Sequence, residues 1–142
     1  MSLRDLDARV ARWTVQALTR TVAAYALLAG LLIIKGGPNR WHGASYATAL
    51  SVPGAPATWG WALLVCGLCG LVGTFYVRAW TWRVVVAGLV GVAAWCLFFA
   101  ASFALTAVHD DHAATTGVPT YLLFSVLSII LAVAYLQNRE PR

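Results

Sequence analysis

The clearest pattern in the sequence is a pair of long apolar runs, at residues 59–77 and 84–108. Neither run contains Asp, Glu, Lys, Arg or His. A helix needs roughly 20 mostly apolar residues to span the hydrocarbon core of a bilayer. The polar segment 78–83 between the runs is only long enough for a tight turn. The pattern therefore predicts a membrane hairpin of two spanning helices.

Two further runs flank this hairpin and predict a first and a fourth span. The first occupies 17–34 and includes Arg20, whose long side chain can reach toward the interface. A cleaved signal peptide is the alternative for this run, although no A-x-A-like cleavage site follows it. The fourth run occupies 121–137. The remaining segments are two loops and a tail, at 35–58, 109–120 and 138–142.

The residues before the first span have an amphipathic pattern. Leu3, Leu6, Val10 and Trp13 recur at three- and four-residue steps and share one helical face, while the arginines point elsewhere. This pattern predicts an interfacial helix over residues 1–16, with its apolar face in the membrane and its arginines at the phosphates. The alternative is a solvated helical extension of the first span.

Composition supports a membrane fold for the whole chain. The 142 residues are 61% hydrophobic and 11% charged, whereas a soluble domain carries about 25% charged residues. Backbone groups in lipid must be paired within helices or a closed barrel. The runs are apolar on all sides rather than alternating with period two, which favours helices over a barrel. The sequence thus predicts an all-α integral membrane protein, with four transmembrane helices and an N-terminal amphipathic helix forming one domain over 1–142.

The basic residues predict the orientation. If the N-terminus lies on one side, eight arginines fall on that side, whereas Lys35 and Arg40 alone fall on the other. Cytoplasmic segments carry such an excess, so both termini are expected in the cytoplasm. Arginine-, alanine- and valine-rich usage indicates a GC-rich bacterial or phage source, so the expected location is the bacterial inner membrane. The residues expected to contact lipid head groups are Arg4, Arg9, Arg12, Arg78 and Arg83.

Small side chains at four-residue spacing predict where helices pack closely. Helices in lipid associate where small residues let their backbones approach. The partner can be another helix of the same chain or a second copy. The predicted packing positions are Ala26 and Gly30 in the first span, Ala62, Cys66, Gly70 and Thr74 in the second, and Ala87 and Gly91 in the third.

Candidate chemistry is sparse. No ionisable residue lies near the middle of a span, which argues against a transporter or an enzyme. Imidazole and carboxylate groups that suit zinc or copper occur in the two loops, at His42, His109, Asp110 and His112. A solvated acidic turn and a pH-responsive loop are the alternatives. We expect no cofactor, no catalytic residues and no nucleic-acid partner; the partners expected are membrane lipids and other membrane proteins.

In outline the chain resembles the small multi-span, holin-like membrane proteins of actinobacteriophage lysis cassettes. The likeness consists of the basic amphipathic N-terminus (Arg4, Arg9, Arg12), the glycine- and alanine-rich spans, and the basic tail (Arg139, Arg142). The resemblance implies self-assembly in the inner membrane through the small-residue positions. It further implies a lesion that releases or activates a lytic enzyme.

A second function fits the residues as well. A lesion lined by protein requires a polar stripe, and the spans offer only a thin one, formed by Thr14, Thr21, Ser102, Thr106, Ser125 and Ser128. The alternative is a non-enzymatic accessory or structural subunit of a larger membrane complex, acting as a scaffold, in assembly or in immunity-type interference. It would present the long loop 35–58 as a contact surface.

Overall fold

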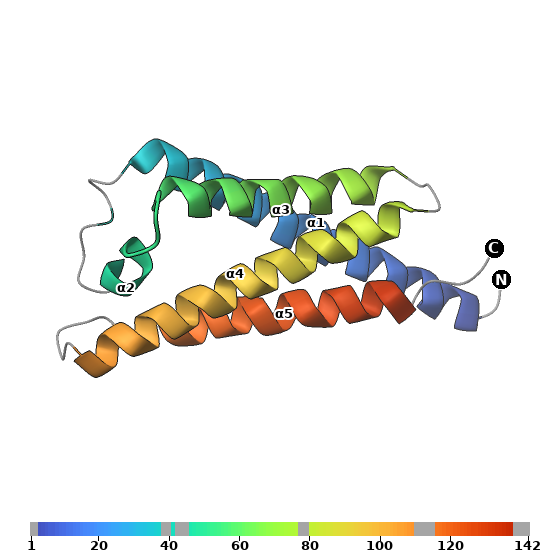
Figure 1. Cartoon of the computed structure of the whole chain (residues 1–142). Coiled ribbons are helices and arrows are strands. Elements are labelled where there is room, and N and C mark those ends of the chain that lie inside the picture. The colour runs from blue at the N-terminus through green and yellow to red at the C-terminus, as the bar shows by residue number, and fades with distance from the viewer. Residues whose placement is uncertain (1–2, 38–40, 42–45, 77–79, 110–115, 138–142) are drawn as a thin grey trace.

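The computed structural model describes residues 3–37, 41, 46–76, 80–109 and 116–137, with the backbone alone for residues 3–5 and 8. Within these ranges the chain is helical apart from short turns and contains no strand. Figure 1 shows five helices. They are α1 (Leu3–Gly36), α2 (Ala47–Leu50), α3 (Ala57–Phe75), α4 (Thr81–His109) and α5 (Gly117–Gln137).

Four of these helices are long and apolar enough to cross a membrane. The qualifying segments are Arg9–Gly36 of α1 together with α3, α4 and α5. The all-α prediction of four apolar spanning helices is therefore confirmed, and it marks the chain as a multi-pass membrane protein. Predicted and observed helix limits differ in several places.

The first difference concerns the N-terminus. A separate interfacial helix over 1–16 is not found, because α1 runs without a break from Leu3 to Gly36. No proline occurs between these residues, so nothing in the sequence interrupts the helical hydrogen bonds. The helix ends where Gly37 adopts a positive φ of 60°, a common helix-terminating conformation for glycine. Of the two alternatives, the structure has the helical extension of the first span.

The other spans begin or end a few residues from the predicted limits. Helix α3 covers 57–75 rather than 59–77, and α4 covers 81–109 rather than 84–108. Helix α5 begins at Gly117, four residues before the predicted 121. Pro119 lies in its first turn, where the missing backbone N–H would have had no helical partner. Reading Gly117 and Pro119 as loop residues was therefore wrong.

Each spanning helix packs mainly against one or two antiparallel neighbours. Helix α1 packs on α3, α3 also packs on α4, and α4 packs on α5; the contact of α1 with α5 is much smaller. Figure 1 shows the start of α1, the end of α3, the start of α4 and the end of α5 at one end of the molecule. We call this the termini end. The opposite end, which contains α2, is the α2 end.

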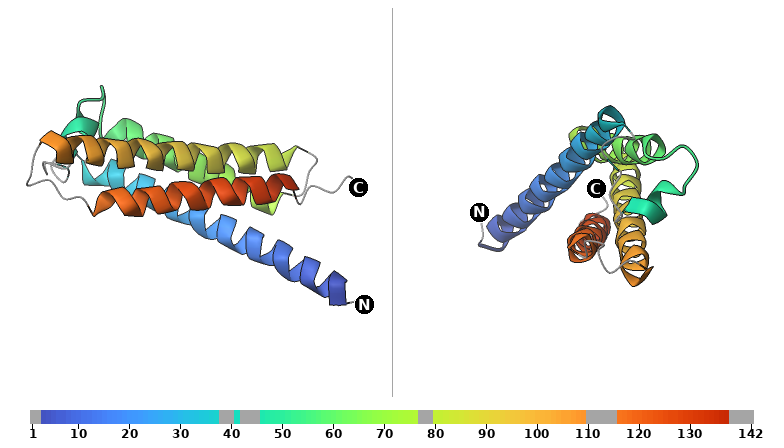
Figure 2. Two further views of the ribbon diagram at one scale, coloured as in Figure 1. Left: turned by 90° about the horizontal axis from the view of Figure 1, so that it is seen from below. Right: turned by 90° about the vertical axis from the view of Figure 1, so that its left-hand side faces the viewer.

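Only part of α1 lies along the bundle. The two views of Figure 2 show its N-terminal half diverging from the other three spanning helices. Arg20 bonds the carbonyl of Thr74, near the end of α3, at 3.3 Å. The 17 described residues before Arg20 are about 25 Å long at 1.5 Å per residue and diverge progressively from the bundle, although Thr19 is still buried and Val15 packs against the core. Among them, Trp13 and Val10 are exposed.

The long loop between α1 and α3 is packed against the bundle where the structure describes it. Ala49 of α2 is fully buried in a cluster with Trp59, Phe99 and Phe103. The hydroxyls of Thr48 and Thr106 lie 2.8 Å apart. Within the segment predicted as a loop, residues 47–50 form the short helix α2. This part of the loop packs against α4 instead of extending away from the bundle.

Candidate functional site

Glycines form the closest contacts between the helices. A Cβ built on Gly67 of α3 would lie 2.6 Å from the amide nitrogen of Leu27 and 2.7 Å from the carbonyl oxygen of Ala23, both in α1. A Cβ on Gly88 of α4 would lie 2.7 Å from the carbonyl oxygen of Cys66 in α3. These backbones can approach only because no side chain separates them.

The predicted packing positions divide into two groups. Ala26, Gly30, Gly70 and Thr74 are buried, and Cys66 and Gly91 are half-buried against one another between α3 and α4. Ala62 and Ala87 are exposed, so they do not mediate packing within the chain, and contact with a second copy stays a prediction for them. Gly60, Gly67 and Gly88 occupy close contacts that the four-residue spacing missed. The seven-residue spacing of Gly60 and Gly67 was the available signal.

Of the candidate metal ligands, only His109 lies in the described ranges. It ends α4, is exposed, and its Nδ1 lies 2.8 Å from the carbonyl oxygen of Leu105. His42, Asp110 and His112 lie outside the described residues. Among the residues that the structure does describe, no three His, Cys, Asp or Glu side chains are grouped to hold a metal.

The arginines expected at lipid head groups are exposed where they are described. Arg9 and Arg12 lie in the N-terminal half of α1, which diverges from the bundle. Arg83 lies in the first turn of α4, with its guanidinium 5.3 Å from the centroid of the Trp82 ring. The side chain of Arg4 and all of Arg78 lie outside the described part. All three described side chains lie toward the termini end.

Arg20 occupies a position that the sequence did not distinguish. It is half-buried between α1 and the end of α3, where one guanidinium nitrogen donates to the Thr74 carbonyl. The same guanidinium lies 4.7 Å from the centroid of the Phe75 ring, a cation–π arrangement. Its Nε is buried and has no partner among the described residues. Arg20 thus joins α1 to α3 at the point where α1 leaves the bundle.

A network of aromatic rings fills the α2 end. Phe99, 1% exposed, lies 5.1 Å from Trp59 edge-on and 4.1 Å from Trp95 in a stacked arrangement. Tyr121 of α5 contacts both Phe99 and Phe103 at centroid distances of 5.6 Å. The rings therefore link α3, α4 and α5 through edge-on, stacked and tilted contacts, which are favourable aromatic geometries.

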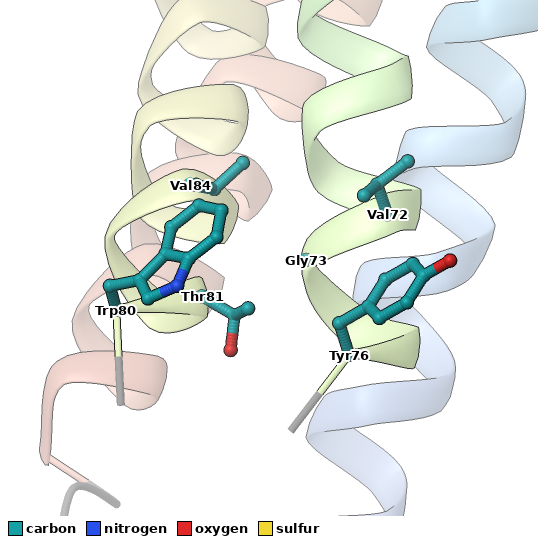
Figure 3. Close-up of a pocket in the computed structure, with 6 residues that line it drawn as sticks. All are labelled: Val72, Gly73, Tyr76, Trp80, Thr81 and Val84. Carbon is teal, nitrogen blue, oxygen red and sulfur yellow. The ribbon is translucent and has the colours of Figure 1, made fainter. Parts of the chain in front are cut away.

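Two cavities of about 360 Å³ each lie at opposite ends of the molecule. The one at the α2 end, here called the tyrosine pocket, is lined by Tyr25, Tyr46, Phe103, Thr116, Gly117, Thr120 and Tyr121. The one at the termini end, the valine pocket, is lined by Val72, Gly73, Tyr76, Trp80, Thr81 and Val84. Figure 3 shows the lining of the valine pocket, drawn from the last turns of α3 on one side and from Trp80 and the start of α4 on the other.

Several buried hydroxyls of the spans are bonded to backbone within the chain, whereas the buried Thr19 hydroxyl of α1 has no partner among the described residues. The Ser125 hydroxyl donates across the helix contact to the carbonyl of Ala93 at 3.0 Å, and the Ser128 hydroxyl donates to Phe124 of its own helix at 2.8 Å. Thr106 donates to the carbonyl of Ser102 at 2.9 Å. These groups hold helices together or cap carbonyls, and their donor capacity is already used.

Comparisons with protein-family models, with curated proteins and with solved structures returned no match. The function is therefore inferred from the geometry of the chain itself.

Proposed function

We propose that the chain is a multi-pass protein of the bacterial inner membrane with both termini in the cytoplasm. The described arginines support this orientation, since Arg9, Arg12, Arg20 and Arg83 lie toward the termini end and Lys35 lies at the end of α1. Cytoplasmic ends of spans carry such an excess of basic residues. Fusion of a reporter to the C-terminus tests it: green fluorescent protein should fluoresce there, and alkaline phosphatase should be inactive. Phosphatase activity would reverse the assignment.

Within that membrane we propose that the protein is a non-enzymatic accessory subunit, which attaches to a larger membrane complex through its helices. The observation that carries this proposal is the burial of the hydroxyls. Ser102, Ser125 and Ser128 are at most 3% exposed and Thr106 is 6% exposed. A water-filled path between copies would need these four groups on the outside, but of the six hydroxyl residues predicted for such a path only Thr14 and Thr21, both in α1, are exposed.

The outward faces suit lipid or another apolar helix. Exposed side chains on α5 include Leu123, Val126, Ile129 and Ile130, and those on α4 include Leu97 and Leu105. A contiguous apolar exterior of this kind is normal against lipid tails. In membranes it is also the surface on which helices of a partner pack, by dispersion contacts.

The test is purification of the tagged full chain from its native host in a mild detergent, followed by native mass measurement. Accessory function predicts foreign membrane subunits in a fixed ratio to the chain, and tolerated expression in cells. A homo-oligomer without foreign subunits would contradict it. So would rapid loss of the membrane potential after induction.

Holin-like permeabilisation by self-assembly is the second candidate, and one observation favours it. Ala87, Ala94 and Ala101 are all exposed on α4 at seven-residue intervals. Small residues at such intervals allow the same helix of another copy to approach. This function predicts depolarised cells and a homo-oligomer that Ala94→Leu weakens, while Val90→Leu, on the same exposed face, leaves it intact. An unchanged oligomer in Ala94→Leu would remove the support.

A further inference from the structure

We propose that the tyrosine pocket binds a quaternary ammonium group. The pocket draws its lining from α1, the residue before α2, α4, and the start of α5. Four of its seven lining residues are aromatic: Tyr25, Tyr46, Phe103 and Tyr121. Aromatic cages of this composition attract organic cations, because the ring faces carry negative charge density.

The rings are held in place by aromatic contacts of their own. Tyr46 and Phe103 meet at 5.1 Å with an angle of 75° between their planes, which makes two adjoining walls. Tyr25 stacks on Phe124 of α5 at 4.9 Å and 9°. Binding therefore requires little ordering of the side chains, and a preorganised site loses less free energy on binding.

Gly117 also shapes the tyrosine pocket. It lines the pocket at the start of α5, where a Cβ would lie 3.0 Å from the Phe103 ring. The absence of that Cβ lets the ring lie directly against the first turn of α5. One wall of the pocket thus depends on a residue without a side chain.

The remaining lining groups favour a cation over an anion or a neutral apolar ligand. Of the seven lining residues that the structure describes, five carry a hydroxyl oxygen and none has a basic or amide nitrogen in its side chain. Thr120 already donates its hydroxyl proton to the carbonyl of Thr116 at 3.1 Å, so its oxygen remains as an acceptor. An anion would find no positive charge in this lining, and a purely apolar ligand would leave the hydroxyls unpaired.

A quaternary ammonium suits the pocket better than a primary ammonium or a metal ion. Among the described residues, the lining offers no carboxylate to replace the hydration shell of a small, strongly hydrated cation. A trimethylammonium group spreads its charge over methyl groups and gives up water at lower cost, so ring faces suffice to hold it. The group can belong to a soluble molecule such as choline or to a lipid head group.

Equilibrium dialysis of labelled choline tests this with the full chain in nanodiscs of phosphatidylglycerol, a lipid without a quaternary ammonium. We expect saturable binding in the millimolar range or tighter. The neutral carbon isostere 3,3-dimethylbutan-1-ol should compete at least roughly tenfold less well, since it lacks the charge. Equal competition by the isostere, or no saturable binding, would overturn the proposal.

Variants assign the binding to the pocket. Tyr25 is 48% exposed, so Tyr25→Leu should fold and weaken choline binding about tenfold by removing one ring. Tyr25→Phe keeps the ring and should bind normally. Tyr76→Leu, in the valine pocket and also exposed, is the matched control. Unchanged binding in Tyr25→Leu, or equal loss in Tyr76→Leu, contradicts the site.

A second set of nanodiscs identifies the source of the group. If phosphatidylcholine in the disc lowers the apparent affinity for free choline, the ligand is a lipid head group. If the affinity is unchanged, the ligand is a soluble cation. Both results retain the same pocket and the same chemistry.

Discussion

The α1–α3 and α4–α5 pairs are both antiparallel, but different residues hold them together. In α1–α3 the backbones approach over Gly30, Gly60 and Gly67, so the contact is made largely by main-chain atoms. In α4–α5 the contact is made by side chains, with Tyr121 against Phe99 and the Ser125 hydroxyl on the Ala93 carbonyl. In lipid no hydrophobic effect drives helices together. Close packing stabilises the α1–α3 pair, and side-chain contacts with a polar bond stabilise the α4–α5 pair.

The comparison has a consequence for tolerance to substitution. A contact between backbones has no side chain that can rotate away, so an added atom at Gly67 meets main chain on two residues of α1. A contact between side chains can relax around a smaller residue, at the cost of a cavity. We therefore expect one added side chain to separate α1 from α3. Single substitutions in the α4–α5 contact should lower its stability gradually.

The largest effect is expected for Gly67→Leu. The new side chain should prevent α1 from docking on α3, because two backbone atoms lie within 2.7 Å of the required Cβ position. Disulfide trapping checks this, with cysteines placed at Leu27 and Leu64 in a chain otherwise free of cysteine. Ala62→Leu, exposed on the same helix, is the control and should leave the trapping yield unchanged. Normal trapping in Gly67→Leu would contradict the close contact.

Phe99→Ala should come next, with a loss of roughly 3 kcal/mol in the free energy of unfolding. Phe99 is 1% exposed and contacts rings from α3, α4 and α5, so its removal leaves a cavity in the aromatic network. Unfolding in mixed detergent and dodecyl sulfate micelles, followed by circular dichroism, measures the loss. Phe98→Ala, which removes a 41% exposed neighbour, should cost much less. Similar losses for the two would remove the case for a network centred on Phe99.

Arg20→Met should cost about 1 kcal/mol, measured in the same way. The variant loses the bond to the Thr74 carbonyl and the cation–π contact with Phe75. It also removes a buried Nε that has no partner among the described residues, which offsets part of the loss. Arg12→Met, in the exposed part of α1, is the control. A gain in stability for Arg20→Met would mean that the buried nitrogen outweighs both contacts.

The smallest effect is expected for Ser125→Ala, at about 0.6 kcal/mol, the usual value of one interhelical hydrogen bond in a membrane. Ser128→Ala removes a bond within α5 alone and should leave the α4–α5 contact unchanged. The free energy of unfolding of each variant, measured in the same micelles, gives the size of each loss. No loss for Ser125→Ala would leave the aromatic rings as the main support of this pair.

The number and class of the spans could be predicted because run length and the absence of charge decide them. The continuity of α1 could not, since the amphipathic pattern before Trp13 and the apolar pattern after it are both helical. The exposure of Ala62 and Ala87 could not be predicted either. Residue spacing shows which residues share a helix face, but not which helix that face contacts. The neighbouring helix depends on which face each helix turns inward: Gly67 places α3 against α1, and Gly88 places α4 against α3.

The tyrosine pocket was beyond prediction for a different reason. Its lining residues are spread from Tyr25 to Tyr121, and no spacing rule connects them. Tyr46 reaches the pocket only because α2 folds back on α4, and Gly117 reaches it only because α5 begins earlier than its apolar run. The histidine-rich loop drew attention in the sequence, whereas the aromatic residues looked like ordinary membrane residues.

Helix α4 has 29 residues and its neighbour α3 has 19. Without Arg83, the residues before it and His109, the apolar part of α4 still has 25 residues at 84–108. At 1.5 Å per residue it is about 9 Å longer than α3, so lipids beside α3 meet a shorter apolar surface. Hydrophobic mismatch of this kind is relieved by tilt of the longer helix or by local thinning of the bilayer beside the shorter one.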